Sequence, residues 1–297
     1  MSVSPKLKLD EDKILNAFTV DLEDWYQGIE LPLQSWKNYT SRIEVGLHRI
    51  LELLDKYRVR ATFFVLGWMA ERYPGLVKEV AVRGHELGSH GLSHEKVYHL
   101  SAEAFRQDVR TTRQLLQDLS GQPVVTHRSP FFSITPGCLW ALKVLSEEGF
   151  TIDCSISPVK TWRYGIKSCP DEIYNITDSG ITEFPVSTFN ILNRRWVIGG
   201  AYFRILPYLF TRRGFYKRQI EGKCTMFYIH PWEYDTDHPG APMEWKARLT
   251  HYARLHQTSP HTERLLKDFR FDNVSRVVEN YAAKHSIRNI TTDLLKD

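Results

Sequence analysis

A short apolar run, Ala17-Phe-Thr-Val-Asp21, leads into the acidic sequence Leu22-Glu-Asp24 and starts a regular alternation of strand and helix signals. The next signal is helical, because its apolar residues recur three or four positions apart: Ile43, Leu47, Ile50, Leu51 and Leu54. A second apolar run, Ala61-Thr-Phe-Phe-Val-Leu66, then predicts another strand. Strand, helix and strand in this order are typical of a parallel sheet with helical crossovers.

The same alternation continues along the chain. Further strands are predicted at 85–89, 123–127, 151–155, 181–184 and 225–229, and helices at 76–82, 105–119 and from Thr135-Pro136 to Leu145. This makes seven strand candidates, of which the first five are separated by helical patterns. We therefore expect an α/β fold with a mostly parallel sheet, open or closed. In such folds the chemistry gathers at the carboxyl ends of the strands.

The bulk composition excludes several classes of protein. The chain has 297 residues, of which 42% are hydrophobic and 25% charged, with a formal net charge of +4. These values disfavour disorder, collagen, coiled coils and membrane-spanning proteins, and the mild charge gives no reason to expect a nucleic-acid partner. The four cysteines have no C-x-x-C spacing. We expect free, buried thiols in a reducing cytoplasm, which agrees with the lack of an apolar leader in the first 13 residues.

Polar residues follow the predicted strands at the expected catalytic edge. They are Asp21, Glu23 and Asp24 after the first strand, His90 and His94 after the third, Arg128 after the fourth, Asp153 in the fifth and His230 after the last. Two histidines four residues apart can hold one metal ion, but among twelve histidines this spacing alone is weak. The conjunction of carboxylates, histidines and an arginine at successive strand ends favours a metal-dependent active site over solvated turns.

Four of these segments resemble the ordered motifs of a known family. They are Phe18-Thr-Val-Asp-Leu-Glu-Asp24, Ser89-His-Gly-Leu-Ser-His94, Arg128-Ser-Pro-Phe-Phe132 and Tyr228-Ile-His-Pro231. Together they are similar to the polysaccharide deacetylases, the family 4 carbohydrate esterases with the NodB-homology fold, over residues 17–235. The resemblance implies a distorted (β/α)7 barrel and metal-dependent hydrolysis of N-acetyl groups on sugars. The opening motif and the stretch 195–210 further resemble a bacterial subgroup found with exopolysaccharide biosynthesis.

The resemblance also implies a role for each catalytic residue. Asp21 would be the base that accepts the proton of the attacking water, and Arg128 would orient that carboxylate. His230 would protonate the departing sugar amine, and Asp153 would orient His230, although a strand-end cap explains Asp153 equally well. A backbone N–H near Phe131 would stabilise the oxyanion together with the metal.

The metal implied by the resemblance is Zn²⁺ or another divalent transition ion, held by His90, His94 and one carboxylate. The family has two adjacent aspartates in its first motif, whereas Leu22 follows Asp21 here. The third ligand must then be Glu23 or Asp24. Strand alternation places Glu23 on the same side as Asp21, whereas a bend after Asp21 would bring in Asp24. We expect Asp24 and keep Glu23 as the alternative.

Aromatic and basic residues suggest contacts with a glycan. Tyr202 and Arg204, within the segment 194–213, are predicted to contact substrate, which could be lipid-linked and anionic. A buried wall of the barrel is the simpler explanation of that segment. Trp25 and Trp232 are candidate platforms for sugar stacking, with core packing as the alternative. Histidines outside the motifs, such as His251, are expected at the surface.

We expect an N-terminal arm (1–16), a deacetylase barrel (17–235) and a C-terminal extension packed on it (236–297). The predicted partner is an N-acetylated glycan, and the predicted location is the cytoplasm, including the inner face of its membrane. The alternative functions are an amidohydrolase acting on a non-sugar amide and a non-catalytic barrel that binds glycan. The second requires a lost ligand or base, yet Asp21, His90, His94, Arg128 and His230 are all present.

Overall fold

A computed structural model describes residues 14–161, 163–240, 243 and 245–296. All seven predicted strands are present as neighbours in one sheet, in the order β10-β1-β2-β3-β4-β5-β7, with every adjacent pair parallel. Their bounds are β1 Leu15–Leu22, β2 Thr62–Val65, β3 Glu86–Ser89, β4 Thr126–His127, β5 Ile152–Asp153, β7 Ile181–Glu183 and β10 Met226–Ile229. The α/β prediction is confirmed, and the arrangement is consistent with a (β/α)7 barrel.

Five further strands were not predicted. β6 (Tyr174–Ile176) pairs antiparallel with β7, and β12 (Arg288–Ile290) extends the sheet beyond β6. β11 (Arg270–Asp272) pairs with the start of β1, while β8 (Thr188–Ile191) and β9 (Arg194–Val197) form a separate hairpin. These strands have three or four residues. Such a segment is too short for the alternation of apolar and polar residues to identify it as a strand.

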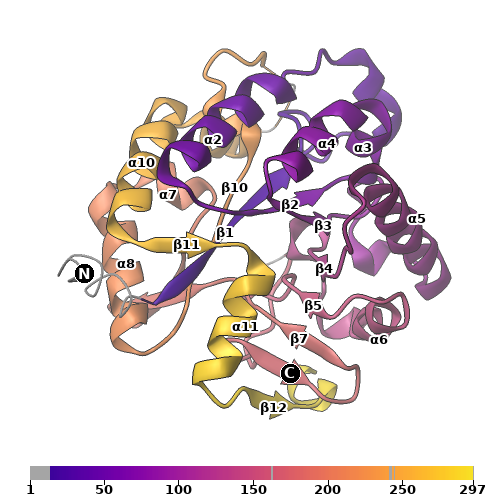
Figure 1. Cartoon of the computed structure of the whole chain (residues 1–297), viewed down its shortest axis with the longest axis vertical. Helices are drawn as coiled ribbons and strands as arrows, with labels where there is room; N and C mark the ends of the chain where they lie inside the picture. The colour runs from indigo at the N-terminus through magenta and orange to yellow at the C-terminus, as the bar shows by residue number, and fades with distance from the viewer. Residues whose placement is uncertain (1–13, 162, 241–242, 244, 297) are drawn as a thin grey trace, which may run out of the picture.

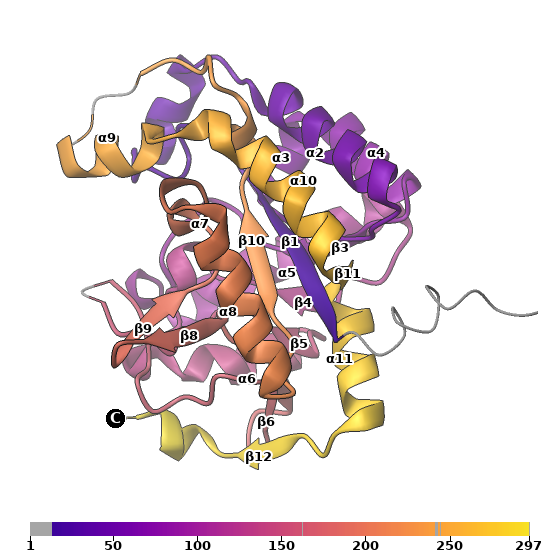
Figure 2. The same cartoon turned by 90° about the vertical axis from the view of Figure 1, so that its left-hand side faces the viewer.

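Helices cover the outside of the sheet (Figures 1 and 2). Their bounds are α2 Ile43–Tyr57, α3 Gly67–Arg72, α4 Pro74–Val82, α5 Ala102–Ser120, α6 Trp140–Glu147, α7 Ala201–Ile205, α8 Tyr208–Ile220, α9 Trp245–Tyr252, α10 Thr258–Asp268 and α11 Val274–Lys284. In α5 the Ser101 side chain caps the first turn by accepting from the N–H of Ala104, and Gly121 ends the helix with φ of 67°. The helix predicted from Thr135 begins as a short 3₁₀ turn, Pro136–Cys138, before α6.

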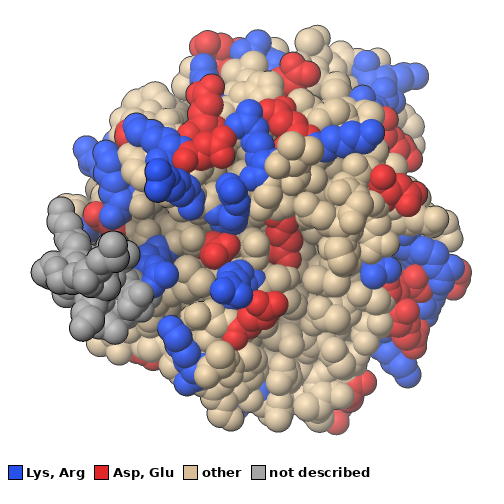
Figure 3. Space-filling model, in the orientation of Figure 1, with Lys and Arg blue, Asp and Glu red and all other residues tan. Residues whose placement is uncertain are grey.

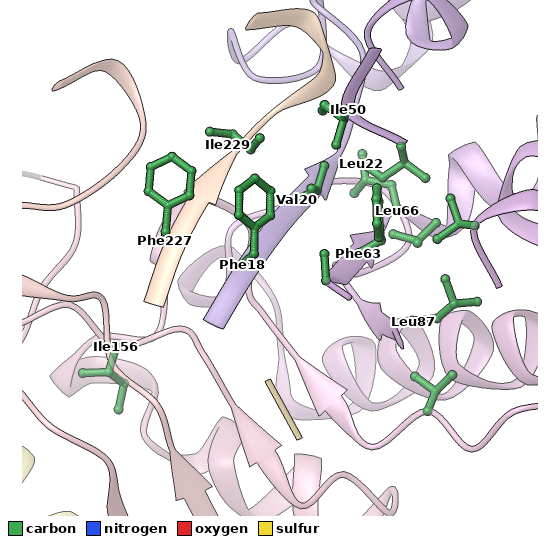
Figure 4. Close-up of a cluster of buried hydrophobic side chains, with 14 of the residues drawn as sticks. Phe18, Val20, Leu22, Ile50, Phe63, Leu66, Leu87, Ile156, Phe227 and Ile229 are labelled. Atoms are coloured by element: carbon green, nitrogen blue, oxygen red, sulfur yellow. The ribbon is translucent and has the colours of Figure 1, made fainter. Parts of the chain in front are cut away.

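Alternation along β1 divides the core into two parts. Phe18, Val20 and Leu22 face the helices, and Phe18 packs against Phe227 of β10 with ring centroids 5.3 Å apart (Figure 4). Ala17 belongs instead to the cluster inside the barrel. Asp21 has the same parity as Ala17, so the strand directs its carboxylate towards the interior at the end where the polar residues gather.

The C-terminal part of the chain returns to the sheet through β11 and β12, on either side of α11. Leu15 and Asn16 belong to β1, and residues 1–13 lie outside the described part, so the predicted arm stays a prediction. The boundary of the extension at residue 236 stays a prediction.

Two bulk properties can be read from the structure. All four cysteines are described, and each is buried and free of a disulfide, as predicted. Basic and acidic side chains are interspersed on the face shown in Figure 3, in keeping with the mild net charge. Within the described residues, none of the helices combines the length and apolar character that crossing a membrane would need.

Candidate active site

Asp21 and Arg128 form a buried ion pair at the carboxyl end of the barrel. Nη1 of Arg128 donates to Oδ1 of Asp21 at 2.5 Å and to the hydroxyl of Thr19 at 3.0 Å. Both charged side chains are almost completely buried, and the guanidinium lies over the ring of Phe64, 4.1 Å from its centroid. Arg128 follows the short strand β4 and reaches across the interior to β1. The arginine therefore fixes the orientation of the Asp21 carboxylate.

His90, His94 and Glu23 converge beside this pair. One ligand atom from each lies within 4.8 Å of the others, and all three side chains are buried. Nδ1 of His90 donates to the carbonyl of Arg128 at 2.8 Å, which leaves its Nε2 to act as a ligand. The His94 backbone is left-handed, with φ of 58°, so the turn after β3 brings its ring back towards His90, 5.1 Å away between centroids.

The residues of this cluster fit a transition metal. Two imidazoles and a carboxylate are the donor set of catalytic zinc sites, which keep positions open for water and substrate. Burial raises the pKa of Glu23 to about 8, and it lowers the pKa values of both histidines well below their usual range. Oε2 of Glu23 accepts no hydrogen bond within the described residues. A bound cation would favour the ionised carboxylate and the neutral imidazoles together.

The expectation that Asp24 supplies the third ligand is wrong in this geometry. Its carboxylate faces the start of α2, where Oδ2 accepts from the Ser41 hydroxyl at 2.5 Å and from the N–H of Arg42 at 3.1 Å. Oδ1 accepts from the N–H of Trp25 at 2.9 Å. Asp24 therefore anchors the beginning of a helix, and Glu23, the alternative, lies with the histidines. The chain does not bend back after β1 as the preference for Asp24 required.

His230 completes the site from β10. Its Nε2 lies 3.1 Å from Oε1 of Glu23 and 3.8 Å from Oδ2 of Asp21. Its Nδ1 donates to Oε1 of Glu233 at 2.8 Å. Burial alone would lower the pKa of His230, but the hydrogen bond to Glu233 and the nearby Glu23 carboxylate outweigh it and raise the pKa to about 9. The two carboxylates beside the imidazole therefore favour its protonated form.

Glu233 is held in turn by Arg204. Oε2 of Glu233 accepts from Nη1 of Arg204 at 2.5 Å, and Arg204 also donates to the carbonyls of Thr250, His251 and Ala253. Burial would raise the pKa of Glu233, but Arg204 and the hydrogen bond from His230 keep it below its ordinary value. Arg204 is 1% exposed with its donors engaged, although it lines the cavity beside His230, so its contact with substrate stays a prediction. It supports the histidine through Glu233.

Asp153 does not orient His230. Its Oδ1 accepts from Nδ1 of His127 at 2.8 Å and from the hydroxyl of Ser155 at 2.6 Å, deep inside the barrel. The predicted role of Asp153 belongs to Glu233, three residues after the histidine it serves. The turn Pro231–Tyr234 produces this contact, because it folds the Glu233 side chain back onto the backbone N–H and the ring of His230. The sequence His-Pro-Trp-Glu has the spacing of a capping box, and recognising that motif would have predicted the contact between Glu233 and His230.

The predicted aromatic contacts divide into two groups. Phe131 lines the catalytic cleft beside His94, with ring centroids 4.5 Å apart and a left-handed backbone at φ of 55°. Trp232 also lines the cleft, but its ring stacks on His230 and on His251. Trp25 is 1% exposed and donates to the carbonyl of Thr40, so it is a core residue and not a platform for a sugar.

Tyr202 is 45% exposed and packs edge-on against Trp196 of β9. It lines neither the catalytic cleft nor the cavities beside it, and its contact with substrate stays a prediction. His251 is 6% exposed, so its predicted surface position is wrong. No periodic pattern in the sequence indicated that His251 is buried, because α9 is short and its polar and apolar residues follow no regular order.

The catalytic cleft lies between two larger cavities. The cleft has a volume of about 200 Å³ and is lined by Asp21, Glu23, both histidines of the cluster, Phe131 and His230. A cavity of about 600 Å³ adjoins it on the side of His230, and one of about 470 Å³ adjoins it on the side of His94. The site is thus an open groove with the reactive groups near its middle.

Two different protein families match two successive segments of the chain. Residues 43–150, which contain His90, His94 and Arg128, match the family described as polysaccharide deacetylase. Residues 154–279, which contain Arg204, His230 and Glu233, match a domain of unknown function (DUF3473). Asp21 and Glu23 precede both matches. The site is therefore assembled from both matched segments and from the strand before them.

Known relatives agree with this assignment. The chain is 34% identical over 104 residues to a peptidoglycan-N-acetylglucosamine deacetylase of Bacillus cereus, covering 35% of the chain and 37% of the relative. It is 30% identical over 129 residues to a chitooligosaccharide deacetylase of Rhizobium leguminosarum, covering 42% of the chain and 57% of the relative. The chain thus spans between about a third and three fifths of the length of these two relatives.

A solved structure supports the fold over the whole chain. It is that of a candidate polysaccharide deacetylase from Mycobacterium smegmatis, with a TM-score of 0.65 and 21% identity, covering 98% of this chain and 96% of that one. At this identity the similarity speaks for the fold alone. The comparisons thus show two things: residues 43–150 match the polysaccharide deacetylase family, and the whole chain has the fold of the Mycobacterium smegmatis protein.

Proposed function

We propose that this protein is a metal-dependent hydrolase that removes N-acetyl groups from a sugar of a polysaccharide or of its glycan precursor. The observation that supports the proposal best is the convergence of three groups in one cleft. The Glu23–His90–His94 cluster, the Asp21–Arg128 pair and His230 meet at the carboxyl ends of the strands. They supply a ligand set, a base and an acid, which are the parts that amide hydrolysis requires.

The proposed metal is Zn²⁺, held by Glu23, His90 and His94. When bound, such an ion lowers the pKa of a coordinated water and polarises the carbonyl of the acetamide. The Nδ1–H of His90, fixed on a backbone carbonyl, keeps this imidazole in the tautomer that a ligand requires.

In the proposed reaction Asp21 accepts a proton from the attacking water. Arg128 holds the Asp21 carboxylate in place for that transfer. The water oxygen bonds to the carbonyl carbon, and a backbone N–H beside Phe131 stabilises the oxyanion. His230 then donates its proton to the sugar nitrogen as the C–N bond breaks, which releases acetate and the free amine.

The relatives support an N-acetylated glycan as the substrate, since their names specify peptidoglycan N-acetylglucosamine and chitooligosaccharides. The resemblance of the opening motif extends the proposal to a precursor of an exopolysaccharide, including a lipid-linked one.

The test is acetate release from N-acetylated oligosaccharides. We expect activity that is lost on chelation and restored by Zn²⁺, and that falls by about 10²- to 10⁴-fold in Asp21→Asn. Full activity in the chelated protein or in Asp21→Asn would contradict the mechanism.

A further inference from the structure

Helix α8 and the β8–β9 hairpin expose apolar side chains that the proposed reaction does not use. Nine large hydrophobic side chains are exposed among the described residues, and five of them fall within residues 192–220. They include Leu192, Ile220 and Leu209, which are 93%, 87% and 68% exposed. Single exposed hydrophobic residues need no explanation, whereas a cluster of them marks an interaction surface.

The exposed face of α8 is an amphipathic stripe. Leu209, Arg213, Tyr216 and Ile220 follow one another three or four positions apart, so they lie along one side of the helix over about 17 Å. The buried residues of the helix are on the opposite side: Tyr208, Thr211, Gly214, Phe215 and Arg218. The stripe is therefore a second apolar face that the core of the protein does not cover.

The hairpin is fixed beside this helix (Figure 2). Phe189 of β8 packs edge-on against Phe210 of α8, with ring centroids 5.0 Å apart. Nζ of Lys217 donates to the carbonyl of Asn190 at 2.9 Å, two residues before the tip of the hairpin. The exposed Leu192 at the tip and the stripe on α8 thus belong to the same side of the barrel, and together they form the α8–hairpin surface.

The tip of the hairpin holds a leucine in an unfavourable backbone conformation. Leu192 and Asn193 are the two residues of the loop between β8 and β9, and both are left-handed, with φ of 50° and 58°. Asparagine, aspartate and glycine adopt this turn readily, whereas leucine is strained in it. The leucine side chain does not pack into the core. An apolar environment outside the protein explains why it stands there.

The α8–hairpin surface is positively charged. Residues 184–220 contain seven lysines and arginines and no aspartate or glutamate. Arg204 and Arg218 are buried, which leaves five cations nearer the surface: Arg194, Arg195, Arg212, Arg213 and Lys217. Arg212 pairs with Asp268 at 3.1 Å, but within the described part of the chain Arg194 and Arg213 form no ion pair. These cations surround the exposed apolar residues.

The combination of charge and apolar residues discriminates between partners. A nucleic acid or an acidic polysaccharide would pair with the cations but would gain nothing from the exposed leucines. A second copy of this chain would bring like charges together across a two-fold interface. An anionic phospholipid surface satisfies both features, because its headgroups pair with lysine and arginine while aliphatic and tyrosine side chains enter the boundary of the acyl chains.

We propose that the α8–hairpin surface binds membranes that contain anionic phospholipids. Leu192, Leu209, Tyr216 and Ile220 enter the lipid boundary, and the surrounding arginines and lysine pair with the headgroups. The inference goes beyond the proposed function and does not depend on it. Docking here would hold the proposed active site next to the surface at which a lipid-linked glycan lies.

The test is sedimentation of the purified protein with vesicles of equimolar phosphatidylglycerol and phosphatidylcholine, and with vesicles of phosphatidylcholine alone. We expect at least about tenfold tighter binding to the anionic vesicles, and weaker binding as the salt concentration rises. Arg213→Glu should weaken this binding by about tenfold. Lys143→Glu makes the same change at an exposed position of α6 and should bind like the wild type.

The apolar contribution is tested by Leu192→Asn and Ile220→Ser, each of which should weaken binding by about tenfold. Val82→Ser is the matched control, because Val82 is as exposed as Ile220 but lies on α4. Leu192→Asn should also leave the protein at least as stable as the wild type, because asparagine tolerates the left-handed backbone. Its loss of binding therefore could not be attributed to unfolding.

The proposal is wrong if the wild type binds neither kind of vesicle or both equally, or if the controls weaken binding as much as the test variants. A solution dimer that Ile220→Ser dissociates, without binding to vesicles, would also contradict it and identify an interface between two copies. The vesicle assay needs no turnover. A protein that binds anionic vesicles but releases no acetate would therefore contradict the proposed function alone.

Discussion

Nδ1 of His230 and Oε1 of Glu233 lie 2.8 Å apart, and the same carboxylate oxygen accepts from the backbone N–H of His230 at 3.1 Å. The ring and the backbone of the histidine are thus fixed by one acceptor. We expect Glu233→Ala to lower kcat by about 10- to 100-fold with a small effect on KM, because the imidazole loses its orientation and its proton affinity. Steady-state kinetics on an N-acetylated oligosaccharide would measure the separate effects on kcat and KM.

Asp153→Asn is the matched control for that experiment. Asp153 is as deeply buried as Glu233 but accepts from His127 and Ser155. The substitution should lower stability and leave kcat of the folded protein close to that of the wild type. A loss of kcat comparable to that of Glu233→Ala would mean that Asp153 supports the reaction after all.

Metal content should distinguish Glu23 from Asp24. We expect the purified protein to carry about one transition-metal ion per chain, and Glu23→Gln to lose most of it, because the amide is a poor ligand beside two imidazoles. Asp24→Asn should keep the metal, because its carboxylate binds Ser41 and the start of α2. Elemental analysis measures the metal content of both variants. Loss of the metal from Asp24→Asn and its retention in Glu23→Gln would identify Asp24 as the ligand.

The buried pair of Asp21 and Arg128 makes a prediction about stability. Arg128→Met leaves the Asp21 carboxylate in the interior without its cation, and we expect a loss of about 3–5 kcal/mol in the free energy of unfolding. The double variant Asp21→Asn with Arg128→Met removes both charges and should recover part of that loss. Denaturant titrations of the two proteins, both without metal, would show it. Equal stabilities would contradict a buried, paired charge.

The buried position of His85 leads us to expect that the folded protein loses stability in acid. Its Nδ1 accepts from the N–H of Ala61, and burial lowers its pKa to about 4. Between pH 6.5 and 4 the unfolded chain binds the proton and the folded chain does not. Stability should therefore fall as the pH falls through this window, by up to about 3 kcal/mol from this group.

His85→Asn keeps an acceptor for Ala61 but cannot be protonated. Buried carboxyls such as Asp108, whose pKa is raised to about 6, add an opposite slope that is common to both proteins. The measurement is the difference between the two curves of unfolding free energy against pH. That difference should depend on pH only between about 4 and 6.5. A constant difference would show that His85 does not titrate as stated.

Gly46 tests how closely α2 supports the turn that carries His230. A Cβ at this position would lie 1.9 Å from the carbonyl oxygen of Pro231. Gly46→Ala should therefore cost about 1–3 kcal/mol and lower kcat by displacing the neighbouring histidine. Gly75→Ala in α4, where a Cβ meets nothing within 4 Å, is the control and should be neutral or slightly stabilising. Normal activity in Gly46→Ala would show that the turn adjusts freely.

The regular parts of the fold could be predicted from the sequence. The strands β1 and β2 and the helix α2 carry strong, uninterrupted patterns, and the polar residues that follow them point to one edge of the sheet. Phe18, Val20 and Leu22 alternate with Thr19 and Asp21, and in the structure the Asp21 carboxylate lies inside the barrel. The short strands β6, β8, β9, β11 and β12 were missed, because their pairing is decided by distant segments.

The site was predicted less completely, for three physical reasons. The choice between Glu23 and Asp24 depends on the path of the chain after β1, which no local propensity determines. The partner of His230 depends on the tight turn at Pro231, whereas the prediction for Asp153 assumed a contact across the barrel. Arg204 was predicted to contact substrate, with a buried wall of the barrel as the alternative for its segment, and the packing of the segment 250–253 shows why it is buried.

The pairing of β1 with β10 joins residues more than two hundred positions apart, as in Val20 opposite Ile229. Asp21 and His230, the proposed base and acid, therefore meet only when β10 is added beside β1. A nascent chain that ends before residue 230 holds Glu23, His90 and His94, the proposed metal ligands, but lacks the proposed proton donor. We expect the proposed activity to appear late in synthesis, once β10 has paired with β1, and incomplete chains to lack it.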